Sequence, residues 1–187
     1  MLRTFLAIDL PGSVRPALAQ VQEELRRCGA DVRWVPVGNI HLTLKFFGEI
    51  AEARVEPLCA AAGEVAARQA SFRLQLTGAG AFPSLKNPRV VWMGVGGDLP
   101  VVGALHRQLE AAFEALGFPR EGRPFAPHLT LGRVKSPRGR ERLTDCLSRL
   151  VDPETPPFPV SEIILYRSIL SPQGATYVPL KVITLGG

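Results

Sequence analysis

The sequence predicts an α+β fold of two similar lobes, in which two antiparallel sheets flank a central cleft and helices lie on the outside. Three observations support this prediction: short strand-like segments with few helices between them, a tetrapeptide that occurs twice, and an order of elements that repeats around it. The length of 187 residues suits one compact domain or two small lobes that share a core. We therefore treat residues 1–187 as a single domain made of two lobes.

The first half of the chain alternates strand and helix patterns that are separated by turn residues. Ser13 can cap the first helix, and Gly29 is placed to end it. The predicted elements are, in order, a strand over residues 3–9, a helix over 13–27, an extended segment over 32–35, a turn over 36–39, a strand over 41–47, an alanine-rich helix over 52–69 and a strand over 72–77.

The second half follows the same pattern. Its first helix is amphipathic, because apolar residues recur along one face. The predicted elements are, in order, a strand over residues 89–95, that helix over 98–116, a loop over 117–127, a strand over 128–134, a helix over 139–150, a strand over 160–168 and a last strand over 175–184.

The two halves repeat each other. A shift of 87 residues, which is the separation of His41 and His128, places the first His-Leu-Thr-Leu tetrapeptide on the second. The same shift places residues 5–8 on 92–95. Each half then reads strand, helix, His-Leu-Thr-Leu strand, helix, strand, so we infer two lobes related by an approximate two-fold axis.

The two tetrapeptides carry the candidate chemistry. Residues two apart in a strand share a face, so His41 lies beside Thr43 and His128 beside Thr130, while the leucines anchor the opposite face. A two-fold axis through the cleft would set the two imidazoles opposite each other. One imidazole can then take a proton from attacking water while the other gives a proton to the leaving oxygen, as an in-line displacement at phosphorus requires. The threonine hydroxyls can hold the non-bridging phosphate oxygens.

The composition indicates which class of partner and which cellular compartment to expect. The net charge of +5 and a pI of about 9.6 favour a polyanionic partner. No apolar run approaches the roughly 20 residues of a membrane span, and the apolar stretch 5–8 is too short for a signal peptide, so we expect a cytoplasmic protein without membrane contact. The cysteines Cys28, Cys59 and Cys146 match no metal or redox spacing, and we expect reduced, partly buried thiols.

A metal site is the first rival interpretation, and we expect neither a metal nor a cofactor. Zinc takes three or four ligands from histidine, cysteine or carboxylate side chains. Neither tetrapeptide carries such a ligand on its histidine face, and Glu49 lies too far along its strand to reach a metal beside His41 without a bend.

The motifs and their flanks resemble the bacterial and archaeal RNA 2′,3′-cyclic phosphodiesterases, also called 2′-5′ RNA ligases, of the two-histidine phosphoesterase superfamily. The resemblance covers nearly the whole chain. Its segments are RWVP at 33–36, NIHLTLKFFGE at 39–49, PRVVW at 88–92, FAPHLTLGR at 125–133, LYRS at 165–168 and GATY at 174–177.

The resemblance implies metal-free hydrolysis of a terminal 2′,3′-cyclic phosphate to a 2′-phosphate in a basic cleft. It implies that His41 is the proton donor to the leaving 3′ oxygen and that His128 is the proton acceptor that activates water. It also implies a weak reverse reaction that joins RNA ends through a 2′-5′ linkage. We expect the partner to be an RNA end with a cyclic phosphate, such as that of a tRNA fragment, and the protein to be a monomer.

Further residues surround this candidate site. The family pattern places Arg133 at the phosphate, and we expect Gly132 to permit the bend that turns it there. Lys45 is expected to share the face of Thr43 and could contact RNA phosphates or solvent. His106 has no evident partner, and we expect it to have a structural role. The basic residues that could form an RNA track, or simply a solvated helix start, are Arg133, Lys135, Arg138, Arg140 and Arg142. The aromatic residues that could stack on a terminal base, although most are expected in the core, are Trp34, Phe46, Phe47, Trp92, Phe125 and Tyr177.

Two alternatives stay open at this point. The same site could act on a small cyclic nucleotide or an ADP-ribose cyclic phosphate, which a comparison of oligonucleotide and mononucleotide turnover would reveal. The chain could instead be an RNA-binding or RNA-remodelling module with an idle site, in which case replacing both histidines would leave RNA binding and its effects unchanged.

Overall fold

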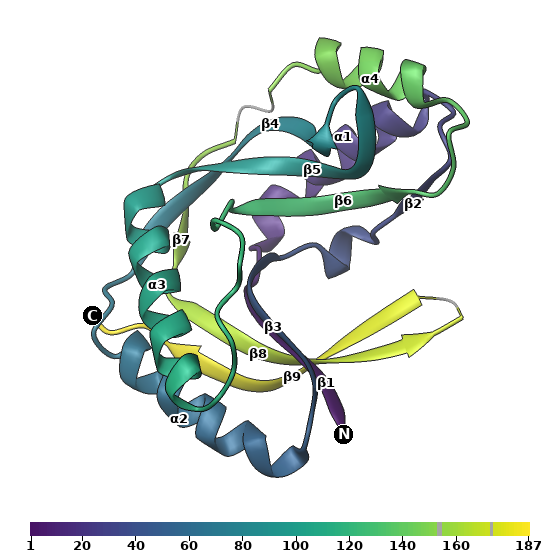
Figure 1. The fold of residues 1–187 in the computed structure, drawn as a ribbon. Coiled ribbons are helices and arrows are strands. Elements are labelled where there is room, and N and C mark those ends of the chain that lie inside the picture. The colour runs from purple at the N-terminus through teal and green to yellow at the C-terminus, as the bar shows by residue number, and fades with distance from the viewer. Residues whose placement is uncertain (153–154, 173) are drawn as a thin grey trace.

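The computed structural model of the protein describes residues 1–152, 155–172 and 174–187. Figure 1 shows two lobes, one above the other. The strands are β1 (Leu2–Ile8), β2 (Val32–Trp34), β3 (Leu42–Ile50), β4 (Phe72–Ser84), β5 (Asn87–Gly97), β6 (His128–Val134), β7 (Phe158–Val160), β8 (Glu162–Ser171) and β9 (Gly174–Thr184). The α-helices are α1 (Arg15–Arg26), α2 (Val55–Ala66), α3 (Leu99–Ala115) and α4 (Arg140–Arg149), and short 3₁₀ turns are η1 (Gly12–Val14), η2 (Val37–Asn39) and η3 (Glu52–Arg54).

Hydrogen bonds connect the strands of the described residues in the order β7-β4-β5-β6-β3-β1-β8-β9, and β2 also pairs with β6. A single register pair, Leu42 with Leu129, joins β3 to β6. The sheet therefore divides at this pair into a first lobe of β1, β3, β8 and β9 and a second lobe of β2, β4, β5, β6 and β7. The predicted α+β class with two antiparallel sheets is confirmed. The one register pair that joins the two sheets lies within the His-Leu-Thr-Leu motifs.

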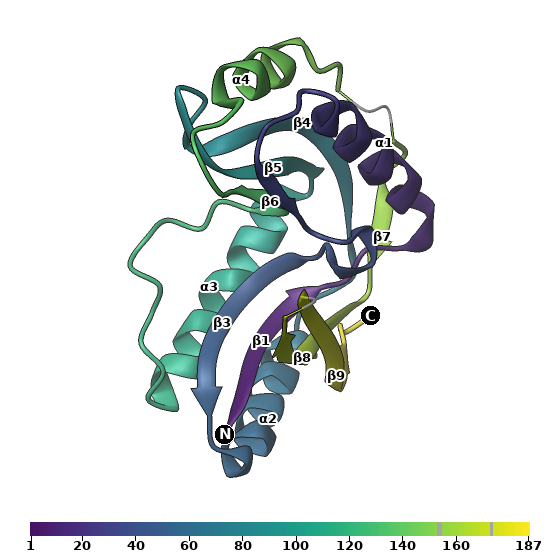
Figure 2. The same ribbon diagram turned by 90° about the vertical axis from the view of Figure 1, so that its right-hand side faces the viewer.

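The helices cover the lobes in a crossed arrangement. Helix α1 comes from the first half of the chain but lies with α4 on the second lobe, whereas α3 comes from the second half and packs with α2 on the first lobe. Figure 2 shows the same grouping from the side. Each lobe is thus built from both halves of the sequence, and neither lobe is formed by one repeat alone.

The predicted strand over residues 160–168 is in fact two strands, one in each lobe. Strand β7 ends at Val160 and pairs with β4, while β8 begins at Glu162 and pairs with β1. Ser161 is the residue at which the chain passes from one lobe to the other. A continuous apolar pattern cannot show this crossing, because both strands bury their side chains in the same core.

The predicted cap at Ser13 is wrong. Ser13 lies inside the 3₁₀ turn η1, and α1 begins at Arg15 without a side-chain cap. Pro16 stands in the first turn, where its missing N–H has no intrahelical partner to lose. Gly29, with a φ of +66°, follows the helix as predicted and supplies a backbone conformation that other residues adopt at a cost.

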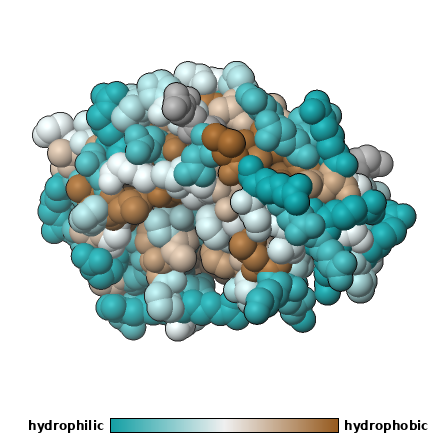
Figure 3. Space-filling view, turned by 90° about the horizontal axis from the view of Figure 1, so that it is seen from above, coloured by the Kyte–Doolittle hydropathy of each residue, from teal (hydrophilic) through white to brown (hydrophobic). Residues whose placement is uncertain are grey.

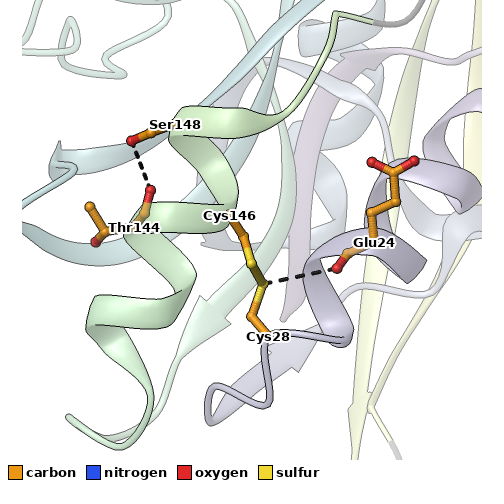
Figure 4. The surroundings of a disulfide bond; sticks show 5 residues. All are labelled: Glu24, Cys28, Thr144, Cys146 and Ser148. Atoms are coloured by element: carbon orange, nitrogen blue, oxygen red, sulfur yellow. Dashed lines mark hydrogen bonds between the residues drawn. A yellow bond between two sulfur atoms is a disulfide. The ribbon is translucent and has the colours of Figure 1, made fainter.

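The expectation of three reduced thiols is also wrong. Cys28, just after α1, forms a disulfide with Cys146 in α4, and only Cys59 among the described residues is a free, buried thiol (Figure 4). The two joined residues are 118 positions apart in the sequence. Sequence spacing could not indicate the bond, because it depends on α1 and α4 packing side by side on one lobe.

The surface seen from the side of α4 is mostly hydrophilic, with small hydrophobic patches between the polar side chains (Figure 3). None of the helices in the described ranges has both the length and the apolar character needed to cross a membrane.

Candidate active site

His41 is held at the entrance to β3. It directly precedes the strand, which begins at Leu42 rather than at the histidine as predicted. Its Nδ1 lies 2.8 Å from the backbone oxygen of Asn39, and because a carbonyl can only accept, Nδ1 carries the proton. The ring stacks on Phe5 at a centroid distance of 4.6 Å. These contacts leave Nε2 as the atom with which His41 can exchange a proton.

His128, the first residue of β6, is held in the same way. Its Nδ1 donates to the backbone oxygen of Ala126 at 2.7 Å, again two residues before the histidine. Phe82 contacts the ring edge-on at a centroid distance of 4.9 Å. The two motifs therefore share the same hydrogen bond from Nδ1 to the backbone oxygen two residues earlier. In both histidines this leaves Nε2 available for proton transfer.

The four leucines of the motifs are buried, as the strand pattern predicted. Leu42, Leu44, Leu129 and Leu131 have exposed fractions of 4% or less. Thr43 is exposed and Thr130 half-buried, so each threonine lies on the side opposite to the leucines. The alternation of faces thus holds in both tetrapeptides.

One cleft with two arms brings the predicted site residues together. The His41 arm, a cavity of about 420 Å³, is lined by both motif histidines, both motif threonines and Arg133. The Phe82 arm, of about 670 Å³, is lined by His128 but not by His41. Both arms share five lining residues: Thr43, Phe46, His128, Thr130 and Arg133.

Arg133 reaches the cleft because of a β-bulge. On β5, Trp92 pairs with Thr130 and the preceding residue Val91 pairs with Gly132, so Leu131 is an extra residue in β6. The extra residue returns Arg133 to the face of Thr130, although the two are three positions apart. Close packing also requires a glycine between these two residues, because a Cβ at Gly132 would lie 2.6 Å from a methyl carbon of Val32 on β2.

The first motif has an equivalent bulge. Lys45 pairs with Leu6 and Thr43 with Ala7, so Leu44 is the extra residue in β3. This places Phe46, the counterpart of Arg133 in the repeat, on the cleft face. Phe46 is 47% exposed, and the Arg3 guanidinium lies 4.6 Å from its ring centroid.

Two of the other aromatic candidates line the cleft, and the remaining three pack against neighbouring residues. Phe125 lines the Phe82 arm and Tyr177 the His41 arm. Phe47 packs against Phe113 and Phe118, while Trp92 lies over the backbone of Gly80 and Trp34 over that of Gly132.

Lys45 is buried in an ion pair, which overturns the expectation that it shares the face of Thr43 and meets solvent. Its ammonium lies 2.7 Å from Oε1 of Glu110 on α3, and both side chains are at most 7% exposed. It also donates to the backbone oxygen of Pro119 at 2.6 Å. The bulge after Thr43 explains the difference, because it takes the Lys45 side chain off the face of Thr43 and toward α3, at the border of the Phe82 arm.

His106 does have partners, contrary to the expectation. It is buried and stacks on Phe125 at a centroid distance of 4.0 Å, and burial lowers its pKa although Glu110 acts in the opposite direction. Glu110 also accepts a hydrogen bond from the backbone N–H of Glu121 at 2.7 Å. Together with Lys45, these residues tie the loop 117–127 to the first lobe, and this loop carries Ala126, the anchor of His128.

The basic cluster predicted around α4 is mostly outside the cleft. Of its members, Arg133 lines the cleft, whereas the rest lie beyond it at or near the start of α4. The guanidinium of Arg140 donates to the side chain of Asn87 at 3.3 Å. The members of the cluster other than Arg133 therefore lie on the outer side of the second lobe.

The sequence reasoning missed the role of Asn39. Its backbone oxygen anchors His41, while its side-chain Nδ2 donates to the backbone oxygen of Ala175 on β9 at 2.8 Å. This residue therefore couples His41 to the hairpin of β8 and β9, whose residues Ser168 and Tyr177 line the same arm. Only its position two residues before His41, matched by Ala126, could have drawn attention to it.

Burial sets the protonation state of His41. It lowers the pKa of the ring from its ordinary value, although the Asn39 carbonyl and the charge of Asp9 act in the opposite direction, so the free protein favours the neutral ring. Within the described residues, no group of three or more histidine, cysteine, aspartate or glutamate side chains is placed to share a metal ion.

Comparisons with known proteins identify the family of this chain. The family model of LigT-like phosphoesterases matches residues 8–92 and 100–177. An RNA 2′,3′-cyclic phosphodiesterase of Methanothermobacter thermautotrophicus is 36% identical over 184 residues, which cover 98% of this chain and 99% of that protein. The crystal structure of the Thermus thermophilus protein TT0787 superposes with a TM-score of 0.80 at 32% identity, covering 100% of this chain and 99% of the other.

A crystal structure of E. coli LigT in complex with 3′-AMP superposes with a TM-score of 0.78 at 29% identity, covering 100% of this chain and 98% of the other. The matched residues include both tetrapeptides and Arg133. By sequence and by structure, the chain belongs to the LigT-like phosphoesterase family.

Proposed function

We propose that the protein hydrolyses the terminal 2′,3′-cyclic phosphate of RNA to a 2′-phosphate, without a metal ion. The observation that carries this proposal is the matched pair of histidines, each anchored through Nδ1 and each lining one cleft with a threonine and Arg133. The relatives named RNA 2′,3′-cyclic phosphodiesterase supply the substrate class.

In the proposed reaction, Nε2 of His128 takes a proton from water as the water oxygen bonds to phosphorus. The bond from phosphorus to the 3′ oxygen breaks on the opposite side, and Nε2 of His41 gives that oxygen its proton. Thr43, Thr130 and Arg133 hold the non-bridging oxygens, where charge must be stabilised throughout the displacement.

The lowered pKa of His41 sets a condition on this assignment. A neutral His41 cannot donate a proton from Nε2, so it must become protonated when the anionic phosphate enters the cleft and raises its pKa. An exchange of roles, with His41 as base, is the pseudo-symmetric alternative that the experiments must distinguish.

A 5′ hydroxyl that replaces water as the nucleophile would form a 2′-5′ linkage, and ligation is therefore part of the proposal as a side activity. The exposed ring of Phe46, which borders both arms, offers a stacking surface for the terminal base.

The test is incubation of the pure protein with a short RNA ending in a 2′,3′-cyclic phosphate, in excess EDTA, followed by identification of the product. A 2′-phosphate is expected, and His128→Ala serves as the control that forms none. A 3′-phosphate would contradict the assignment of the leaving oxygen. Product that forms only after addition of a divalent metal would contradict the metal-free mechanism.

A further inference from the structure

Arg33 and Arg133 lie side by side on the second lobe. They are register partners on the neighbouring antiparallel strands β2 and β6, so their side chains share a face about 5 Å apart. That face is the cleft face, because Val35, two residues beyond Arg33, lines the His41 arm. Arg33 is exposed and belongs to the RWVP segment, to which the proposed reaction gives no role.

Arg89 extends this row on the other side of Arg133. On β5, Val90 pairs with Arg133 and with Phe82, but Pro88 pairs with Pro83, so Arg89 is an extra, unpaired residue. The bulge turns its side chain into the Phe82 arm, which it lines together with Val90. Three strands thus present three guanidinium groups across one face.

The row carries positive charge that the protein does not neutralise. Within the described residues, no carboxylate lies within 4 Å of Arg33, Arg89 or Arg133, whereas Arg15 and Arg120 each have such a partner. Like charges directly opposite each other on paired strands are destabilising, so the arrangement favours a bound anion. The acidic side chain that lines the Phe82 arm is Glu121, and it is exposed.

We propose that Arg33 and Arg89 bind backbone phosphates of the RNA upstream of its terminal nucleotide, beside the phosphate held by Arg133. This inference rests on the proposed function and adds that the enzyme selects an oligonucleotide over a mononucleotide. The row spans two strand spacings, about 10 Å, which exceeds the rise of about 3.4 Å per phosphate of a helical strand. It therefore reaches at least one phosphate besides the terminal one.

The test compares hydrolysis of a hexaribonucleotide ending in a cyclic phosphate with hydrolysis of adenosine 2′,3′-cyclic phosphate. Arg33→Gln and Arg89→Gln are each expected to lower kcat/KM for the hexanucleotide about tenfold, the size of one charged hydrogen bond, and to leave the mononucleotide unchanged. Arg68→Gln, an exposed arginine that follows α2 on the first lobe, is the matched control and should change neither.

A binding measurement keeps this inference separate from the proposed reaction. The wild-type dissociation constant for a hexaribonucleotide ending in a 3′-phosphate is measured against salt, and each variant should reduce the slope of log Kd against log salt by about 0.7. Wild-type protein that turns over neither substrate would refute the proposed function, while the slopes would still decide on the arginines. Equal losses on both substrates, or slopes equal to that of Arg68→Gln, would overturn the inference.

Discussion

Replacing Lys45 by methionine should strongly destabilise the fold, because it leaves the Glu110 carboxylate buried without its cation. The two charged groups lie 2.7 Å apart and are at most 7% exposed, so solvent screens them little. Apart from the Lys45 ammonium, Oε1 of Glu110 has no polar partner among the described residues, so this ammonium alone compensates its burial. Removing one member of such a buried pair costs about 3–5 kcal/mol of unfolding free energy. For a chain of this length, that corresponds to a fall of about 6–20 °C in Tm.

The effect should depend on pH in a defined direction. In the wild-type protein burial raises the pKa of Glu110, but Lys45 and the N–H of Glu121 outweigh it, and the net pKa is lowered. Ionised Glu110 therefore contributes stability above its unfolded pKa of about 4.3, and this contribution is lost as the pH falls below that value. In Lys45→Met, burial dominates and the carboxyl can become neutral at a higher pH. The Tm deficit of the variant should therefore be smaller at pH 5 than at pH 7.

The assay is thermal unfolding of the wild type, Lys45→Met and Arg120→Met at both pH values. Arg120 forms a 2.8 Å ion pair with Glu114, but those side chains are more than 50% exposed, so its loss should cost less than about 1 kcal/mol. Glu110→Gln in the Lys45→Met background should recover part of the stability. A Lys45→Met protein as stable as Arg120→Met, or a deficit equal at pH 5 and pH 7, would refute the reasoning.

Two further predictions concern the histidine roles and the disulfide. Sulfur in place of the 3′ oxygen of the cyclic phosphate makes a leaving group that departs without a proton, so His41→Ala should lose about 10²–10⁴-fold on the oxygen substrate but little on the sulfur one. His128→Ala should lose activity on both, and the opposite pattern in single-turnover rates would exchange the roles. Replacing Cys28 and Cys146 by serine should lower the unfolding free energy by about 5 kcal/mol, from the 118-residue separation of the bonded cysteines. Denaturant unfolding that is unchanged by this double replacement would contradict the disulfide's contribution.

Features that depend on local periodicity were predictable from the sequence. The positions of the main strands and helices follow from apolar patterns of short range, and the repeat of His-Leu-Thr-Leu indicated a paired site. Both tetrapeptides bury their leucines and place their threonines on the opposite face because a strand alternates its side chains at every residue. The same alternation, applied without a bulge, misplaced Lys45.

Features that depend on which elements meet were not predictable. The pairing of Cys28 with Cys146 requires α1 and α4 to pack on one lobe, and the burial of Lys45 requires α3 to cross to the other. The repeat suggested that each half forms its own lobe, yet the helices are exchanged between them. A sequence repeat predicts that the two halves contain similar strands and helices. It does not predict which lobe each helix covers.

The two bulges explain how a nearly symmetric scaffold forms an asymmetric site. The last residue of each motif, Leu44 in β3 and Leu131 in β6, is an extra residue that returns the third residue after the threonine to the cleft. In the first lobe this residue is Phe46, an exposed ring, and in the second it is Arg133, a cation. A ring can stack on a base, whereas a guanidinium binds phosphate oxygens, so the same backbone position supplies two different contacts. In the proposed reaction, the matched histidines act as acid and base on a phosphate that the two lobes would contact by unlike means, and this difference would set the direction in which the substrate lies across an otherwise two-fold cleft.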